Sequence, residues 1–162
     1  MIRQRGLHQV HETEVGSIPI IIYRLLGQID GRGYFAEVCL RKDEPQQGQQ
    51  IIFHAQTPLP IGEFRGYNAL QYNEHDEYCQ SVAFGIYYAL ANHEARAHIE
   101  PCTITVLHVG ERIVDTTLDT IAYTSALATW KLLRIEPAHE PYIENHQIQF
   151  PGRKPTIIIN DK

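Results

Sequence analysis

The first third of the chain alternates apolar runs with short polar segments, which is the pattern of antiparallel strands. Residues 18–26 are rich in β-branched side chains and predict a strand. Asp30 and Gly31 then supply a tight turn. Residues 34–41 alternate with a period of two, which predicts a second strand with one face wetter than the other. A third strand is expected over 51–56, so that the three strands form a meander.

Two later segments repeat apolar residues at the spacing of a helix. Residues 76–92 begin with acidic side chains and carry one apolar face, and Gly85 within them indicates a close helix crossing. Residues 116–133 predict a longer helix, around which the rest of the domain is organised. Thr116, followed three residues later by Asp119, forms a start that is similar to a capping box.

The longer helix carries apolar side chains on two sides. One stripe of mostly small residues predicts the side that packs on a sheet: Leu118, Ile121, Ala122, Ser125, Ala128 and Leu132. A second stripe, formed by Tyr123, Leu127 and Trp130, lies roughly opposite. Because one sheet covers only one of these stripes well, the second stripe needs another cover. The pattern leaves two alternatives, a second copy of the chain or the chain's own C-terminal residues.

Both ends of the chain and one internal stretch lack this periodicity. Residues 1–17 predict an irregular polar lead, and residues 57–76 predict a long loop. From residue 135 onward, four prolines exclude a helix and predict an extended tail. The apolar run 156–159 near the end of this tail would serve as an edge strand or as an arm over the second stripe.

The predicted fold class is α+β, with elements in the order β-β-β-α-β-α. A fourth strand at 102–109 stands between the two helices. We expect a two-layer sandwich, with both helices on one face of a mixed sheet of about four strands. The predicted organisation is an N-terminal lead over 1–17, one α+β domain over 18–134 and a Pro-rich C-terminal extension over 135–162.

The composition is that of an ordinary soluble globular chain, with 43% hydrophobic and 20% charged residues among 162. The formal charge of -5 excludes attraction to nucleic acid through overall charge, so any RNA contact must come from a local patch. Cys39, Cys79 and Cys102 include no CxxC pair, which indicates a reducing compartment and buried, apolar roles. No segment reaches the ~20 apolar residues of a membrane span, so we expect a cytoplasmic protein without membrane contact.

The sequence contains no motif of a recognisable catalytic chemistry, such as GxSxG, HExxH, a P-loop or a Rossmann fingerprint. We therefore expect no enzyme activity, no metal and no small-molecule cofactor. His8 and His11, with Glu12 beside them, have a metal-ligand spacing but no third ligand nearby. His54 and His108 lie inside predicted strands, where histidines are usually structural, and no role is assigned to them.

Several short stretches, taken in order, resemble domain IV of the translocation factor elongation factor G. The hairpin stretch GRGYFAEVCL is followed by AFGIYYAL in a helix and by VDTTLDTIAYTSALATWKLL at the second helix. Gly31, Arg32, Gly33 and Tyr34 match the family's GGRGQYG-type hairpin, and Val114, Asp115, Thr116 and Thr117 match its VDSS-type step. The resemblance runs from about residue 20 to residue 133.

The resemblance implies the ribosomal protein S5 domain 2-like fold, and it implies that the loops 27–34 and 110–117 lie together at one tip. In the family, this tip enters the decoding region of the small ribosomal subunit and contacts tRNA and mRNA. The candidate RNA-binding residues that follow are Gly31, Arg32, Gly33, Tyr34, Glu111, Arg112 and Asp115. The family's tip histidine would fall at Arg112, Asp30 replaces one of its glycines, and the loop 57–76 is longer than in the family.

Two classes of function remain in view. The first is a stand-alone module that binds RNA or the ribosome through the tip, where Arg32 and Arg112 offer guanidinium groups and Tyr34 a stacking ring. Because the chain carries no GTPase motif, no translocase activity of its own is expected. The second is a protein-interaction or oligomerisation module without a nucleic-acid role, including a homodimer formed through the second stripe.

Overall fold

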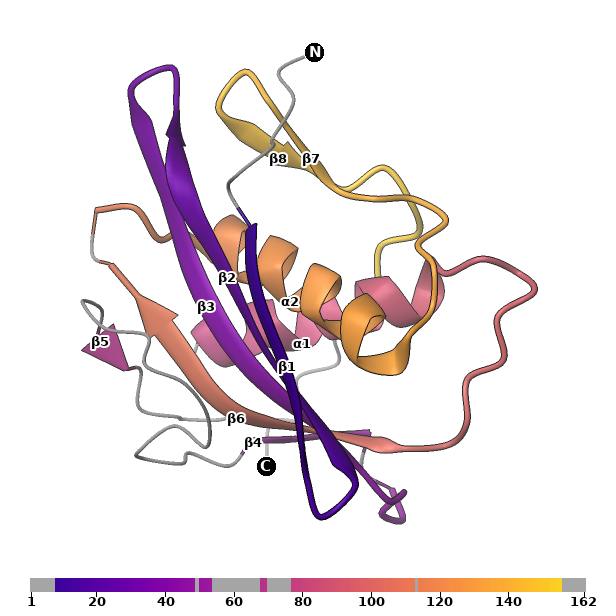
Figure 1. Ribbon diagram of the computed structural model, residues 1–162. Helices are drawn as coiled ribbons and strands as arrows, with labels where there is room; N and C mark the ends of the chain where they lie inside the picture. The colour runs from indigo at the N-terminus through magenta and orange to yellow at the C-terminus, as the bar shows by residue number, and fades with distance from the viewer. Residues whose placement is uncertain (1–7, 49, 54–67, 70–76, 113, 156–162) are drawn as a thin grey trace.

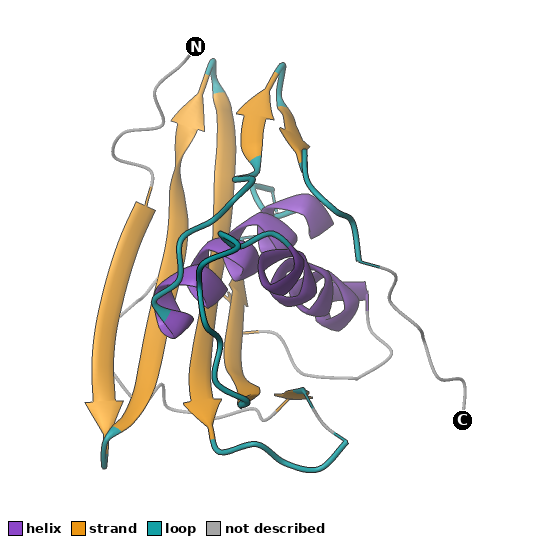
Figure 2. Ribbon diagram, turned by 90° about the vertical axis from the view of Figure 1, so that its right-hand side faces the viewer, coloured by secondary structure: helices purple, strands orange, loops and turns teal. Residues whose placement is uncertain are grey.

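The computed structural model describes residues 8–48, 50–53, 68–69, 77–112 and 114–155. They form a β-sheet, two helices on one of its faces and a small C-terminal hairpin (Figures 1 and 2). The strands of the sheet are β1 (His8–Val15), β2 (Ile18–Ile29), β3 (Arg32–Asp43), β4 (Ile51–Phe53), β5 (Asn68–Ala69) and β6 (Thr103–Glu111). The helices are α1 (Glu77–Ala91) and α2 (Leu118–Leu133), and the hairpin is β7 (Tyr142–Glu144) and β8 (Gln147–Gln149). The predicted α+β class, with both helices on one face, is confirmed.

The strands of the sheet lie in the order β1-β2-β3-β6-β4, and β5 pairs with the end of β6. Neighbours from β1 to β6 are antiparallel, whereas β4 runs parallel to β6, so the sheet is mixed as predicted. The predicted meander is wrong for its third strand, because Ile51–Phe53 pairs with β6 and not with β3. An apolar run indicates a strand, but it does not identify the neighbour of that strand.

The N-terminal lead is also not irregular where the structure describes it. Residues 8–15 form the edge strand β1, which pairs antiparallel with β2 from His8 opposite Leu25 to Val15 opposite Ile18. Most of its side chains face solvent, so β1 has little of the apolar alternation by which a strand is recognised. Because successive side chains of a strand point to opposite faces, His8 and His11 do not converge on one site.

The two helices cross at Gly85 in α1. A Cβ atom at this position would lie 2.2 Å from the carbonyl oxygen of Ala122 and 2.7 Å from Cβ of Ser125. Only glycine therefore allows this separation of α1 and α2, and the predicted close crossing is confirmed. The helices and the sheet enclose one large apolar cluster, which includes Ile21, Val38, Leu40, Val82, Ile86, Val106, Ile121 and Ala128.

Helix α2 begins one residue later than the capping pattern predicted. Its N-cap is Thr117, whose hydroxyl accepts a bond from the Thr120 backbone N–H, while the Thr117 N–H donates to Thr120 Oγ1. The hydroxyl of Thr116 is engaged elsewhere, because it donates to the Phe35 carbonyl oxygen at 2.8 Å. Asp119 lies in the first turn of the helix, as predicted, near the positive end of its dipole.

The second stripe of α2 is covered within the chain. Trp130 is 3% exposed, lies edge-on to Tyr88 of α1 and donates its Nε1–H to the Ala89 carbonyl oxygen at 3.0 Å. Tyr123 packs with Leu25 of β2 and with Ile148 of the C-terminal hairpin. Of the two alternatives for this stripe, the structure therefore shows cover by the chain's own residues. The run 156–159, expected as an edge strand or as an arm over the stripe, lies outside the described residues.

The predicted extended tail contains a hairpin that is fastened to α1. The strands β7 and β8 are joined by a tight turn at Asn145 and His146, which have φ values of 50° and 62°. Beyond the hairpin, the Asn92 side chain bonds both the backbone N–H and the carbonyl of Arg153, at 2.7 and 2.8 Å. The predicted loop over 57–76 lies outside the described residues, except for Asn68–Ala69, which form β5.

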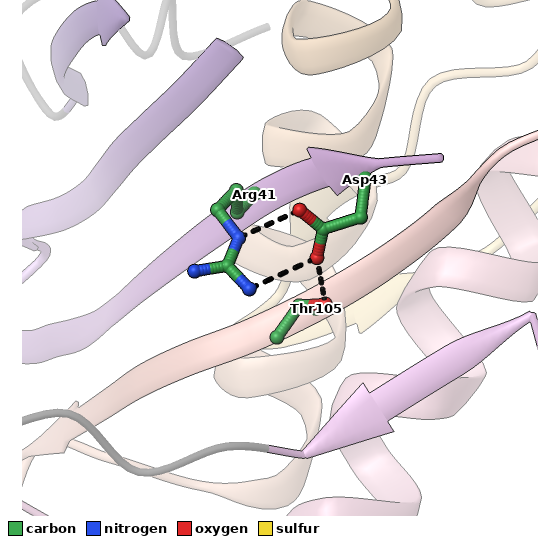
Figure 3. Close-up of polar contacts among 3 residues, drawn as sticks. All are labelled: Arg41, Asp43 and Thr105. Atoms are coloured by element: carbon green, nitrogen blue, oxygen red, sulfur yellow. Dashed lines mark hydrogen bonds and ion pairs between the residues drawn. The ribbon is translucent and has the colours of Figure 1, made fainter. Parts of the chain in front are cut away.

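The sheet face that lies away from the helices is less exposed to solvent than the alternation along residues 34–41 predicted. Phe35, Glu37 and Cys39 of β3 point to this face and are fully buried. At the end of β3, Asp43 accepts two bonds from the Arg41 guanidinium at 2.8 and 3.1 Å and one from the Thr105 hydroxyl of β6 (Figure 3). This contact ties β3 to β6 at the end of the strand where β3 leaves the sheet.

Candidate functional site

The two loops that were predicted to share one tip lie together in the structure. The Phe35 N–H of β3 donates to the Asp115 carbonyl oxygen at 2.9 Å, beside the bond from Thr116 to Phe35. A Cβ atom on Gly33 would lie 2.2 Å from Oδ1 of Asp115. Gly33 therefore lets the Asp115 side chain lie directly against it, and the β2–β3 turn is bonded to the loop that precedes α2.

The loop between β6 and α2 is closed by its own hydrogen bonds. The backbone N–H groups of Asp115 and Thr116 donate to the Arg112 carbonyl oxygen at 3.0 and 2.9 Å. The Arg112 N–H in turn donates to Oγ1 of Thr116 at 2.9 Å. Val114 projects from this loop with 91% of its surface exposed, and Glu111 is half-buried at the end of β6. These bonds join residue 112 to residues 115 and 116, and Val114 is an exposed apolar side chain next to them.

The two arginines of the tip lie on opposite faces of β3. The Arg32 guanidinium lies 5.9 Å from the ring centroid of Tyr34, whose ring faces the helices. The Arg112 guanidinium lies 4.8 Å from the ring centroid of Phe35. Because neighbouring residues of a strand point to opposite faces, Phe35 and Arg112 are on the face away from the helices. The predicted patch is therefore divided into two halves by the hairpin.

Tyr34 is not an accessible stacking ring, which corrects the sequence-based hypothesis. It is 3% exposed and packs among Leu25, Tyr123 and Ile148. The alternation of β3 already placed Tyr34 on the same face as Ala36 and Val38, which is the face that the helices cover. The ring of Tyr34 thus serves as a platform beneath Arg32, and only its hydroxyl reaches the edge of the tip.

A third turn, which the sequence analysis missed, lies at the same tip. The hydroxyl of Tyr34 is 3.5 Å from Nδ1 of His146, and Nη1 of Arg32 donates to the His146 carbonyl oxygen at 3.5 Å. Figure 2 shows the β2–β3 and β7–β8 hairpins ending side by side. A signal was present in the sequence, because Asn145 and His146 stand between the apolar Ile143 and Ile148. Asn is a favoured residue in tight hairpin turns.

The tip also carries carboxylates, although Arg32 is not neutralised by one within the described ranges. Asp30 is exposed in the β2–β3 turn, and the side chain of Asp115 lies against Gly33. No ion pair joins Arg32 to any acidic residue of the described chain. Among the described residues, the Arg32 guanidinium has one hydrogen bond, to the neutral carbonyl of His146, and Arg32 is exposed to solvent. The positive charge of Arg32 is therefore available to an anionic ligand.

A buried charged cluster lies below the tip, on the face away from the helices. Glu37 is fully buried, accepts a bond from Nε of Arg24 at 2.8 Å and lies 3.2 Å from Nε2 of His108. A β-bulge between β3 and β6 lets both Leu107 and His108 point to this face. The bulge could not be predicted from the sequence, because a bulge has no periodic pattern. The burial of His108, which is 6% exposed, agrees with the structural character expected of a histidine inside a strand.

This cluster connects with the tip through Phe35. The Arg24 guanidinium lies 5.8 Å from the ring centroid of Phe35. The Arg112 guanidinium contacts the same ring. Nearby, burial and then the charge of Glu37 raise the pKa of the Cys39 thiol to about 12. Cys39 therefore stays protonated at neutral pH and has the buried, apolar role that was predicted for it.

Comparisons with protein families and with curated proteins found no relative of this chain. The sequence matched none of the protein-family models against which it was scanned, and no curated protein matched it either. Within the described residues, neither helix is long and apolar enough to cross a membrane. The case for a function therefore rests on the tip itself and on the resemblance that its residues carry.

Proposed function

We propose that this chain is an elongation factor G domain IV-like module of the ribosomal protein S5 domain 2-like fold, which binds RNA or the ribosome through its tip. One observation carries the proposal. The two loops that match the family are 81 residues apart at Phe35 and Thr116, yet they are bonded to each other. Their junction leaves the Arg32 guanidinium exposed beside them.

The division of the tip by β3 defines how RNA would be held. An RNA strand that crosses the end of the β2–β3 hairpin would meet Arg32 on one face of the hairpin and Arg112 on the other. The planar guanidinium group of arginine suits phosphate oxygens. Each of the two guanidinium groups also lies within cation–π distance of an aromatic ring, 5.9 Å from Tyr34 for Arg32 and 4.8 Å from Phe35 for Arg112. Because the whole chain carries a net charge of -5, binding would depend on these local contacts and would involve few phosphates.

The proposal is tested by co-sedimentation with purified bacterial ribosomes at two salt concentrations. The double variant Arg32→Ala with Arg112→Ala is expected to bind at least about tenfold more weakly than the parent. It should also lower the salt slope by about one for each phosphate that is no longer neutralised. The matched control is Arg96→Ala with Arg153→Ala, which removes the same charge from two exposed side chains elsewhere. A parent that does not sediment with ribosomes, or equally weakened binding in both double variants, contradicts the proposal.

A second function, protein interaction without nucleic acid, is favoured by a different surface. Near the β1–β2 turn, Val15 is 54% exposed and its cross-strand neighbour Ile18 is 41% exposed. Both belong to the end of the sheet opposite the tip, on the outermost pair of strands (Figure 1). Val15 lies on the edge strand β1, whose outer edge suits pairing with a strand of a partner, and its exposed apolar neighbour Ile18 lies on β2.

Sedimentation equilibrium distinguishes this second function. If the edge of β1 associates, the average mass should rise with concentration toward that of a dimer, and Val15→Lys should return it to the monomer mass. A mass that stays monomeric over a wide concentration range removes association between copies of this chain.

A further inference from the structure

We propose that the β7–β8 turn is a third element of the tip, and that His146 binds the same RNA phosphate as Arg32. This inference rests on the proposed function and extends it to a residue outside the region of family resemblance. The two side chains come from hairpins that are 114 residues apart at this contact. They are nevertheless on the same side of β3, the side that faces the helices.

The contacts of the turn place Arg32 and His146 next to each other at the tip. The carbonyl of His146 accepts from one guanidinium nitrogen of Arg32, and the ring of Tyr34 lies beneath that guanidinium. The hairpin is anchored by Ile148, which is buried against Tyr34 and Tyr123. His146 and Arg32 are both exposed. An anion that approaches Arg32 from solvent therefore meets the imidazole of His146 at the edge of the same surface.

The hydrogen-bond chemistry of His146 suits a phosphate oxygen. When the Tyr34 hydroxyl donates to Nδ1 of His146, the imidazole carries its proton on Nε2. Nε2–H then becomes a donor on the side of the ring that faces away from Tyr34. A donor of this kind complements the guanidinium of Arg32, and the two together can bond two oxygens of one phosphodiester group.

The backbone of the turn gives an independent reason to look for a role. Asn145 and His146 both have positive φ values, as in a two-residue turn of type I′. The second position of such turns favours glycine, and the β2–β3 turn has Gly31 there with φ of 78°. A histidine at the equivalent position of the β7–β8 turn adopts this positive φ less easily than glycine does. A non-glycine residue in such a conformation indicates a functional role for its side chain.

The conformation of the turn also provides an informative variant. His146→Gly removes the imidazole and places the favoured Asn-Gly sequence in the turn, so the hairpin should be retained and the melting temperature should not fall. Ribosome binding should nevertheless weaken about tenfold, which corresponds to the removal of one hydrogen bond to a charged group. Arg32→Ala should in addition lower the salt slope by about one, because it removes a guanidinium that is always charged.

The matched control is Asn145→Gly, which changes the neighbouring residue in the same turn and keeps His146. It should bind ribosomes within about twofold of the parent. Equally weakened binding in both variants would assign the effect to the shape of the turn, and parent-like binding by His146→Gly would assign no role to the imidazole; either result overturns the inference alone. If the parent itself does not bind ribosomes, the proposed function fails, and this inference fails with it.

Discussion

Replacing Glu37 with alanine is expected to lower the free energy of unfolding by about 3–5 kcal/mol. Glu37 is fully buried between Arg24 and His108, and its carboxylate accepts the bond from Nε of Arg24. Without the carboxylate, the Arg24 guanidinium loses this buried counter-charge. The loss is a large part of the 5–15 kcal/mol that usually separates folded and unfolded domains. Urea unfolding followed by circular dichroism measures it.

The control for this variant is Glu44→Ala, which removes an exposed carboxylate at the end of β3 and should change stability by less than about 0.5 kcal/mol. A double variant, Arg24→Met with Glu37→Leu, removes both charges of the ion pair and should be more stable than Glu37→Ala alone. If Glu37→Ala costs less than about 1 kcal/mol, the ion pair with Arg24 is not a strong constraint on the fold.

The second large effect is expected at Trp130, where alanine should cost about 3–5 kcal/mol in unfolding free energy. The indole fills the space between α1 and α2, lies edge-on to Tyr88 and bonds the Ala89 carbonyl oxygen. Its removal leaves a cavity that the closely crossed helices cannot fill, because Gly85 and Ala122 are already in contact. The midpoint of urea unfolding should shift accordingly.

Trp130→Phe is the companion variant, since it keeps an aromatic ring and lacks the N–H donor. It should cost clearly less than Trp130→Ala, and it remains measurable if the alanine variant does not fold. Equal stability of the parent and Trp130→Ala would contradict the packing of the indole between the helices.

The elements that the sequence predicted well are those whose burial repeats with a simple period. Helix α2 and strand β3 show this, because α2 packs on the sheet and the core side of β3 alternates cleanly. The edge strand β1 was missed because solvent reaches most of its side chains, so no period appears. The parallel pairing of β4 with β6 was missed because partner choice depends on contacts that no local pattern encodes.

The candidate site likewise has features that could be predicted from the sequence and features that could not. Glycine and the cap residues gave a local signal, and the resemblance added the expectation that the two loops lie together at one tip. The structure places Gly33 against the Asp115 side chain there. The burial of Tyr34 depends on which face the helices cover, and the position of His146 depends on how the tail returns to the tip. Neither could be read from local spacing. The cluster around Glu37 required a bulge, which has no sequence period.

The bond between Phe35 and Asp115 has a consequence for the thermodynamics of recognition. The Phe35 N–H bond to the Asp115 carbonyl oxygen and the Thr116 hydroxyl bond to the Phe35 carbonyl oxygen join the two loops before any ligand arrives. A partner that meets loops already joined in this way avoids part of the entropy cost of ordering them on binding. Association at this tip should therefore resemble the docking of a preformed shape, with little change in backbone hydrogen exchange at Phe35 when the partner binds.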